Sequence, residues 1–113
     1  MIDDDASFRD LARRMLRADG FTVVGEADSV ATGIAAALEL RPDAALVDVG
    51  LPDGDGIALA HELSALPWRP HIVLTSTDPD AASADDVRRA GARAFVAKDQ
   101  LPNAQLRRLL NSH

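Results

Sequence analysis

The chain has 113 residues, of which 47% are hydrophobic, the usual size for one domain with a substantial core. It carries 18 acidic and 12 basic residues, and the net charge of −6 argues against direct nucleic-acid binding, because phosphate backbones select basic surfaces. The absence of cysteine excludes disulfides, thiol catalysis and thiolate metal sites, and it fits a cytoplasmic protein. No apolar run approaches the length of about 18 residues that suggests a membrane span, so we expect no membrane insertion.

Strand and helix patterns alternate along the chain with short connections. Met1 and Ile2 indicate the end of a first strand that is shorter than the usual ~5–6 residues, which predicts a gap in the core and further residues upstream in the natural chain. The alternation predicts an α/β fold, a parallel sheet covered on both faces within one domain over residues 1–113. We expect further strands over residues 21–26, 45–48, 71–75 and 94–97, and helices over residues 6–19, 28–40, 57–66 and 81–90, with a final helix opened by Pro102. The polar side of the first helix is expected to lie largely towards water, with Arg9, Arg13, Arg14 and Arg17.

Polar residues stand where four of these strands end. Asp3, Asp4, Asp48, Thr75 and Lys98 should converge on one edge, because the carboxyl ends of parallel strands point the same way. Clustered carboxylates repel one another unless a cation lies among them, and oxygen ligands without histidine or cysteine favour Mg²⁺, Mn²⁺ or Ca²⁺. Phosphoryl transfer uses such a metal together with an ammonium and a hydroxyl group. The set therefore predicts a magnesium-dependent phosphoryl-transfer site.

At these residues the sequence resembles the receiver domain of two-component response regulators. The matching motifs are Asp3-Asp4, Asp48 in Asp-x-x-Leu-Pro-Asp-Gly-Asp-Gly, Leu74-Thr75, and Phe95-Val96-Ala97-Lys98. The resemblance implies the chemotaxis-receiver-like, flavodoxin-like doubly wound sheet of five parallel strands in the order 2-1-3-4-5. Lys98 followed by Asp99 is common among receivers with a LuxR-type output domain of the NarL class.

The resemblance also implies which residues accept phosphate and hold the metal. Asp48 would accept a phosphoryl group from the phosphohistidine of a sensor histidine kinase. Asp4, Asp48 and the backbone carbonyl of Gly50 would hold Mg²⁺ directly, and Asp3 would hold it through water. Such a domain is not a conventional enzyme, although it catalyses its own aspartyl phosphorylation and dephosphorylation.

The remaining implied roles concern switching. Thr75 and Lys98 would contact the phosphoryl oxygens, and Phe95 would turn inward as Thr75 moves. The surface of the fourth helix and fifth strand would then control an output domain or partner in transcription, and a homodimer would form through the fourth helix, fifth strand and fifth helix.

Two other functions use the same residues. A pseudo-receiver would bind partners without phosphorylation. A hydrolase similar to haloacid dehalogenases would use the Asp-x-Asp spacing of Asp3 and Asp5, although the chain lacks room for a cap and lacks a later acidic pair. A calcium loop starting at Asp53 is rejected, because its twelfth position is Ser64 instead of glutamate.

Overall fold

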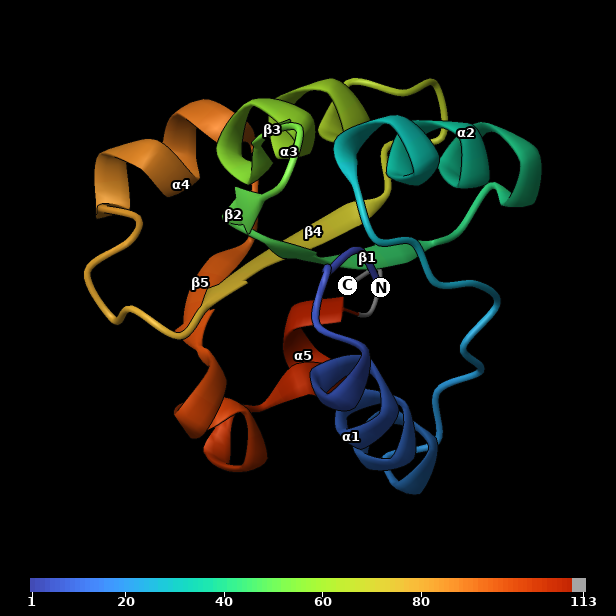
Figure 1. Cartoon of the computed structure of the whole chain (residues 1–113), viewed down its shortest axis with the longest axis vertical. Helices are drawn as coiled ribbons and strands as arrows, with labels where there is room; N and C mark the ends of the chain where they lie inside the picture. Colours follow the sequence, from blue (N-terminus) through green and yellow to red (C-terminus); the bar gives the residue numbers. More distant parts are fainter. Residues whose placement is uncertain (111–113) are drawn as a thin grey trace.

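A parallel sheet lies between two layers of helices (Figure 1). The computed structural model describes residues 1–110 of the chain. One layer of helices consists of α2 (Val30–Leu40), α3 (Gly56–Ser64) and α4 (Ala84–Ala90). The other consists of α1 (Ala6–Ala18) and α5 (Leu106–Leu110). The sheet has the order β1-β4-β5, with β1 (Ala44–Asp48), β4 (His71–Ser76) and β5 (Ala94–Ala97).

The two faces of the sheet bury different side chains of the same strands. Val47 and Leu74 belong to the cluster under α2, α3 and α4, whereas Leu46 and Val73 belong to the cluster against α1 and α5. This alternation follows from the period of two residues in a strand. Because both faces are covered, the strands are apolar on both sides. The predicted α/β architecture is therefore confirmed.

The prediction of five strands is wrong for two of them. Ile2 makes only isolated parallel bridges, to Ala27 on one side and to Val47 on the other. These bridges still place the segments in the predicted order, with residue 27, then residue 2, then β1, β4 and β5. Residues 21–26 form no strand, and the backbone hydrogen bonds of this segment with residues 1–3 are confined to Gly25 and Ala27.

A cavity of about 410 Å³ lies where the short first strand leaves the sheet uncovered. Phe21 and Val23 line it from one side and Leu40 and Ala45 from the other. Leu40 keeps 44% of its surface exposed, which is unusual for a leucine beside a core. The cavity is the gap expected from the sequence.

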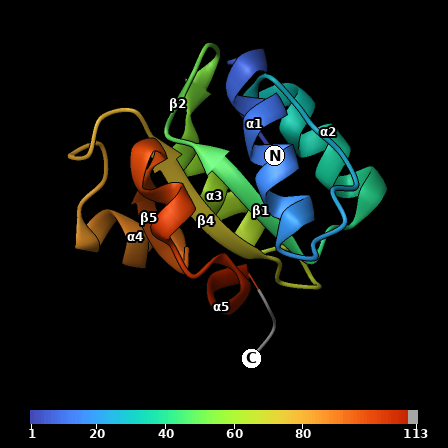
Figure 2. The same cartoon turned by 90° about the horizontal axis from the view of Figure 1, so that it is seen from below.

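Several connections differ from the predicted ones. A short hairpin of β2 (Gly50–Leu51) and β3 (Gly54–Asp55) follows Asp48, as Figure 2 shows. Pro102 lies inside the 3₁₀ helix η1 (Lys98–Asn103) and does not open α5. The fixed φ of Pro102 is compatible with a turn. Because proline has no amide hydrogen, an α-helix would tolerate it only in its first turn. No helix within residues 1–110 is long and apolar enough to cross a lipid bilayer.

The amino ends of β1 and β4 are closed by the chain's only tryptophan. The Trp68 indole Nε1 donates a hydrogen bond of 2.9 Å to the Pro42 carbonyl. The Arg41 guanidinium lies 5.2 Å from the ring centroid. Trp68 thus ties the α3–β4 connection to the start of β1, at the edge of the sheet opposite the carboxyl ends of the strands.

Candidate functional site

Three carboxylates meet at the carboxyl end of the sheet. Asp48 is the last residue of β1, and Asp3 and Asp4 directly follow the bridge at Ile2. Their ligand oxygens lie within 4.8 Å of one another. Asp3 and Asp48 are buried, with 2% and 7% of their surface exposed, whereas Asp4 is exposed. This donor set fits a hard divalent cation that retains some of its water ligands.

Lys98, the first residue after β5, extends its side chain over the carboxylates. Its Nζ lies 2.7 Å from Asp3 Oδ2 and 3.6 Å from Asp48 Oδ2, and only 11% of the side chain is exposed. Burial lowers the pKa of Lys98, but the contacts with Asp3 and Asp48 outweigh it, so the pKa is raised overall. The ammonium therefore stays protonated and offsets part of the negative charge.

Asp48 lies in an environment that disfavours its charged form. Burial, followed by the negative charge of Asp3, raises the pKa of Asp48. Lys98 and the Gly50 amide, which donates to Asp48 Oδ1 at 3.3 Å, oppose this rise without cancelling it. A bound cation would relieve the remaining repulsion.

Thr75 stands beside Asp48 on the neighbouring strand, in register with it. Only 1% of Thr75 is exposed, and its hydroxyl finds no hydrogen-bond partner among residues 1–110. A buried hydroxyl without a partner is uncommon in folded proteins. It provides a donor next to Asp48 for an oxygen that the protein itself does not supply.

Two further predicted site residues lie near this group. Phe95 pairs in register with Leu74 and is half-buried against the cluster under α2, α3 and α4. Gly50 contributes its amide to Asp48 as described, while metal binding by its carbonyl stays a prediction. The switching role of Phe95 also stays a prediction, because the structure shows one position of its ring.

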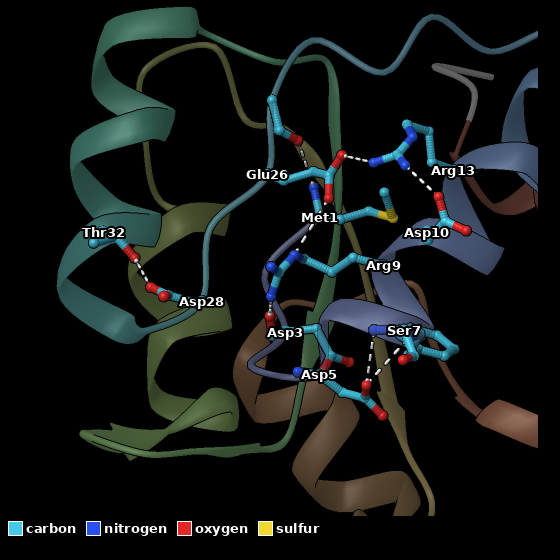
Figure 3. A network of polar contacts seen from close by, with 12 residues as sticks. Met1, Asp3, Asp5, Ser7, Arg9, Asp10, Arg13, Glu26, Asp28 and Thr32 are labelled. Atoms are coloured by element: carbon cyan, nitrogen blue, oxygen red, sulfur yellow. Dashed lines mark hydrogen bonds and ion pairs between the residues drawn. The ribbon is translucent and has the colours of Figure 1, made fainter.

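An ion-pair network holds the backbone at the site (Figure 3). Arg9 donates to the carbonyl oxygen of Asp3 at 2.6 Å and pairs with Glu26 at 3.3 Å. Arg13 pairs with the second oxygen of Glu26. Arg14 and Arg17 are exposed as predicted, but Arg9 and Arg13 are only partly exposed, because both pair with Glu26. Helical periodicity alone does not reveal such a distant partner.

Asp5 does not belong to the carboxylate group. Its side chain caps α1, accepting hydrogen bonds from the amides of Ser7 at 3.0 Å and Phe8 at 3.2 Å (Figure 3). The hydrolase hypothesis needs Asp3 and Asp5 to act together, and this cap removes the second of them from the site.

Phe8, whose amide takes part in this cap, lies at the site although the sequence analysis did not single it out. The Phe8 ring centroid lies 4.2 Å from Lys98 Nζ. An aromatic residue four positions after Asp4 on a helix facing the site is the only signal that could have indicated it.

Comparison with known proteins identifies proteins that are similar to this chain. A family model described as the response regulator receiver domain matches residues 1–111. The DNA-binding transcriptional activator DevR/DosR of Mycobacterium tuberculosis is 43% identical over 101 residues, which cover 88% of this chain and 46% of that protein. The chemotaxis protein CheY of Bacillus subtilis is 30% identical over 98 residues, which cover 87% of this chain and 82% of that protein. The chain thus spans about half the length of the transcriptional regulators that it matches.

Solved structures agree with this assignment. A LuxR-family two-component response regulator from Aurantimonas sp. SI85-9A1 superposes with a TM-score of 0.82 at 26% identity, covering 94% of this chain and 76% of the other. The receiver domain of the putative regulator NarL from Mycobacterium tuberculosis superposes with a TM-score of 0.75 at 29% identity, covering 90% and 83%.

Proposed function

The chain belongs to the response regulator receiver domain family, and from this premise we propose that Asp48 is its phosphoacceptor. The proposal rests on the side chains that surround the Asp48 carboxylate. Asp48 is buried at a strand end, with the Lys98 ammonium 3.6 Å away and the partnerless hydroxyl of Thr75 on the next strand. Both groups can donate to phosphoryl oxygens, as phosphoryl transfer requires.

The proposed donor is the phosphohistidine of a sensor histidine kinase. A carboxylate oxygen of Asp48 forms a bond to phosphorus as the P–N bond to the imidazole breaks, and the imidazole nitrogen keeps the electron pair. Water later attacks the phosphorus, and the Asp48 carboxylate leaves with the electron pair of the P–O bond. The domain thereby catalyses its own phosphorylation and dephosphorylation.

Asp3, Asp4 and Asp48, together with the Gly50 carbonyl, would hold Mg²⁺ at this site. The cluster of carboxylate oxygens within 4.8 Å supports this, as does the raised pKa of Asp48. When bound, Mg²⁺ supplies positive charge that offsets the charge of the phosphoryl oxygens.

We further infer that phosphorylation controls transcription through another part of the protein. DevR/DosR and the KDP operon regulator KdpE of Escherichia coli are among the relatives, and both names describe transcriptional regulators. Movement of Thr75 and Phe95 would change the surface of α4 and β5 for a partner or for a second copy of the domain. That residues 1–113 form one receiver domain, without direct nucleic-acid contact and in the cytoplasm, is part of the same proposal.

Intact-protein mass after incubation with Mg²⁺ and acetyl phosphate tests the acceptor. We expect one added phosphoryl group on the wild type, none on Asp48→Asn, and none on any protein after Mg²⁺ is removed. The matched control is Asp43→Asn, the same change at an exposed position just before the other end of β1. Asp43→Asn should be phosphorylated like the wild type. Labelling of Asp48→Asn would move the acceptor elsewhere, and an unlabelled wild type would favour a pseudo-receiver.

A further inference from the structure

The geometry points to Phe8 as a positioning residue that holds the Lys98 ammonium over the acceptor carboxylate through the face of its ring. This inference rests on the proposed function, because the reaction that it affects is phosphorylation of Asp48. It adds a residue on α1 to a site otherwise formed at strand ends.

The contacts of Lys98 leave one side of its ammonium to Phe8. Nζ is paired with Asp3 at 2.7 Å and lies 3.6 Å from Asp48, and both carboxylates belong to the proposed metal site. The Phe8 ring centroid lies 4.2 Å from Nζ, within the range of about 6 Å in which a ring face attracts a cation. The side chain of Lys98 is only 11% exposed, so water screens this attraction weakly.

The position of Phe8 is itself fixed. Its amide donates to Asp5 Oδ1 at 3.2 Å, in the cap that starts α1. Its side chain is half-buried against the cluster that contains Leu16 and Leu106. The cap and this packing therefore position the ring beside Lys98.

A ring suits this place better than another charged group. A fourth carboxylate would attract Lys98 more strongly, but it would repel the incoming phosphoryl group and compete for Mg²⁺. The face of Phe8 carries no net charge, and it is not a metal ligand. Bound Mg²⁺ would offset part of the charge of Asp3, and the Phe8 ring would still be a contact that keeps the ammonium near Asp48. Phe8 should consequently raise the phosphorylation rate without contributing to Mg²⁺ affinity.

The kinetic test compares two substitutions at position 8 with one elsewhere. Phe8→Leu keeps an apolar side chain but removes the ring, whereas Phe8→Tyr keeps the ring. The control Phe21→Leu makes the same change at a phenylalanine that packs on the same cluster but lines the cavity instead of the site. Phosphorylation rates are measured by intact mass at saturating acetyl phosphate, and Mg²⁺ affinity is measured by calorimetry.

We expect Phe8→Leu to lower the rate about fivefold to twentyfold, with Mg²⁺ affinity unchanged within about twofold. Phe8→Tyr and Phe21→Leu should keep the wild-type rate within about twofold. A wild-type rate for Phe8→Leu would overturn the inference, and so would an equal loss in Phe8→Tyr or a parallel loss of Mg²⁺ affinity.

A second measurement does not depend on phosphorylation. Lys98 is the only lysine among the 12 basic residues, so the NMR signals of its ε-methylene group in lysine-labelled protein need no further assignment. The Phe8 ring should shift them upfield in the wild type and in Phe8→Tyr, but not in Phe8→Leu. Absence of the shift in the wild type would overturn the inference. A wild type that shows the shift but takes up no phosphoryl group would instead contradict the proposed function.

Discussion

The two halves of the sheet are held together in different ways. In the paired half, formed by β1, β4 and β5, continuous ladders join the strands, and Val47, Ile72 and Leu74 have no exposed surface. In the bridged half, formed by residues 1–5 and 21–27, Ile2 makes single-residue bridges beside a cavity of about 410 Å³. Where the paired half has hydrogen-bond ladders, the bridged half has ion pairs of Arg9 and Arg13 on α1 with Glu26.

The functional site lies across the boundary between these halves. Asp48, Thr75 and Lys98 stand on or next to the strands of the paired half, whereas Asp3 and Asp4 stand on the bridged half. The acceptor is thus positioned by a well-packed core, while two of the proposed metal ligands depend on weaker contacts. A cation that binds Asp3, Asp4 and Asp48 should therefore stabilise the contact between the bridged half and the paired half.

The largest expected effect contrasts a core leucine of the paired half with an exposed leucine of α2 that lines the cavity beside the bridged half. Leu74→Ala, at a position with no exposed surface, should lower the free energy of unfolding by about 2–5 kcal/mol. Leu40→Ala, in the wall of the cavity and 44% exposed, should lower it by less than about 1 kcal/mol. Urea unfolding followed by circular dichroism measures both. Equal losses would show that the halves are packed alike, and Ile72→Val offers a milder change, about 0.5–1.5 kcal/mol, if Leu74→Ala does not fold.

Mg²⁺ should strengthen the bridged half. At a free concentration one hundred times its Kd, it should raise the free energy of unfolding by about 2.7 kcal/mol. Hydrogen exchange at the amides of Asp3 and Ala27, which take part in the bridging hydrogen bonds, should slow in parallel. Because the pKa of Asp48 is raised, protons compete with the metal, and the stabilisation should decline as the pH falls.

Asp4→Asn is the matched variant for the Mg²⁺ experiment, because Asp4 is the exposed member of the cluster. It should retain the fold and lose most of the stabilisation. Full stabilisation of Asp4→Asn would exclude Asp4 as a ligand.

A smaller effect tests how rigidly the paired half holds Asp48. A Cβ atom at Gly56 would overlap the carbonyl oxygen of Asp48, whereas one at Gly50 would meet nothing within 4 Å. Gly56→Ala should therefore cost about 1–3 kcal/mol of unfolding free energy and slow phosphorylation of Asp48. Gly50→Ala should change stability by less than about 0.5 kcal/mol. Similar values for both alanine variants would mean that the backbone around Asp48 yields easily.

The smallest effect concerns the ion pairs of the bridged half. Glu26→Gln should lower the free energy of unfolding by less than about 1 kcal/mol, because both pairs are partly exposed to water. The loss should shrink further in high salt. A loss that does not respond to salt would mean that Glu26 acts by packing instead of charge.

The site was more predictable from the sequence than the sheet that carries it. Asp48 ends β1, Thr75 is the penultimate residue of β4 and Lys98 directly follows β5. Because the carboxyl ends of parallel strands meet at one edge, their convergence followed from topology. The irregular course of residues 21–26 did not, because their β-forming residues suit a strand, whereas in the structure only Gly25 and Ala27 form backbone hydrogen bonds with residues 1–3.

Two contacts at the site also could not be predicted. The pairing of Arg9 with Glu26 depends on how a segment without secondary structure folds back over α1. The approach of Phe8 to Lys98 depends on the exact start of α1, which the Asp5 cap fixes. Sequence patterns give helix boundaries only to within about two to four residues.

The location of Trp68 determines which structural changes of this protein intrinsic fluorescence can detect. As the only tryptophan, it dominates the intrinsic fluorescence, and its bond to Pro42 places it at the edge of the sheet opposite the carboxylates. Its emission should change when β1 and β4 separate and stay constant when Asp48 reacts. Trp68 is therefore an optical probe of global unfolding whose emission does not report whether Asp48 is phosphorylated.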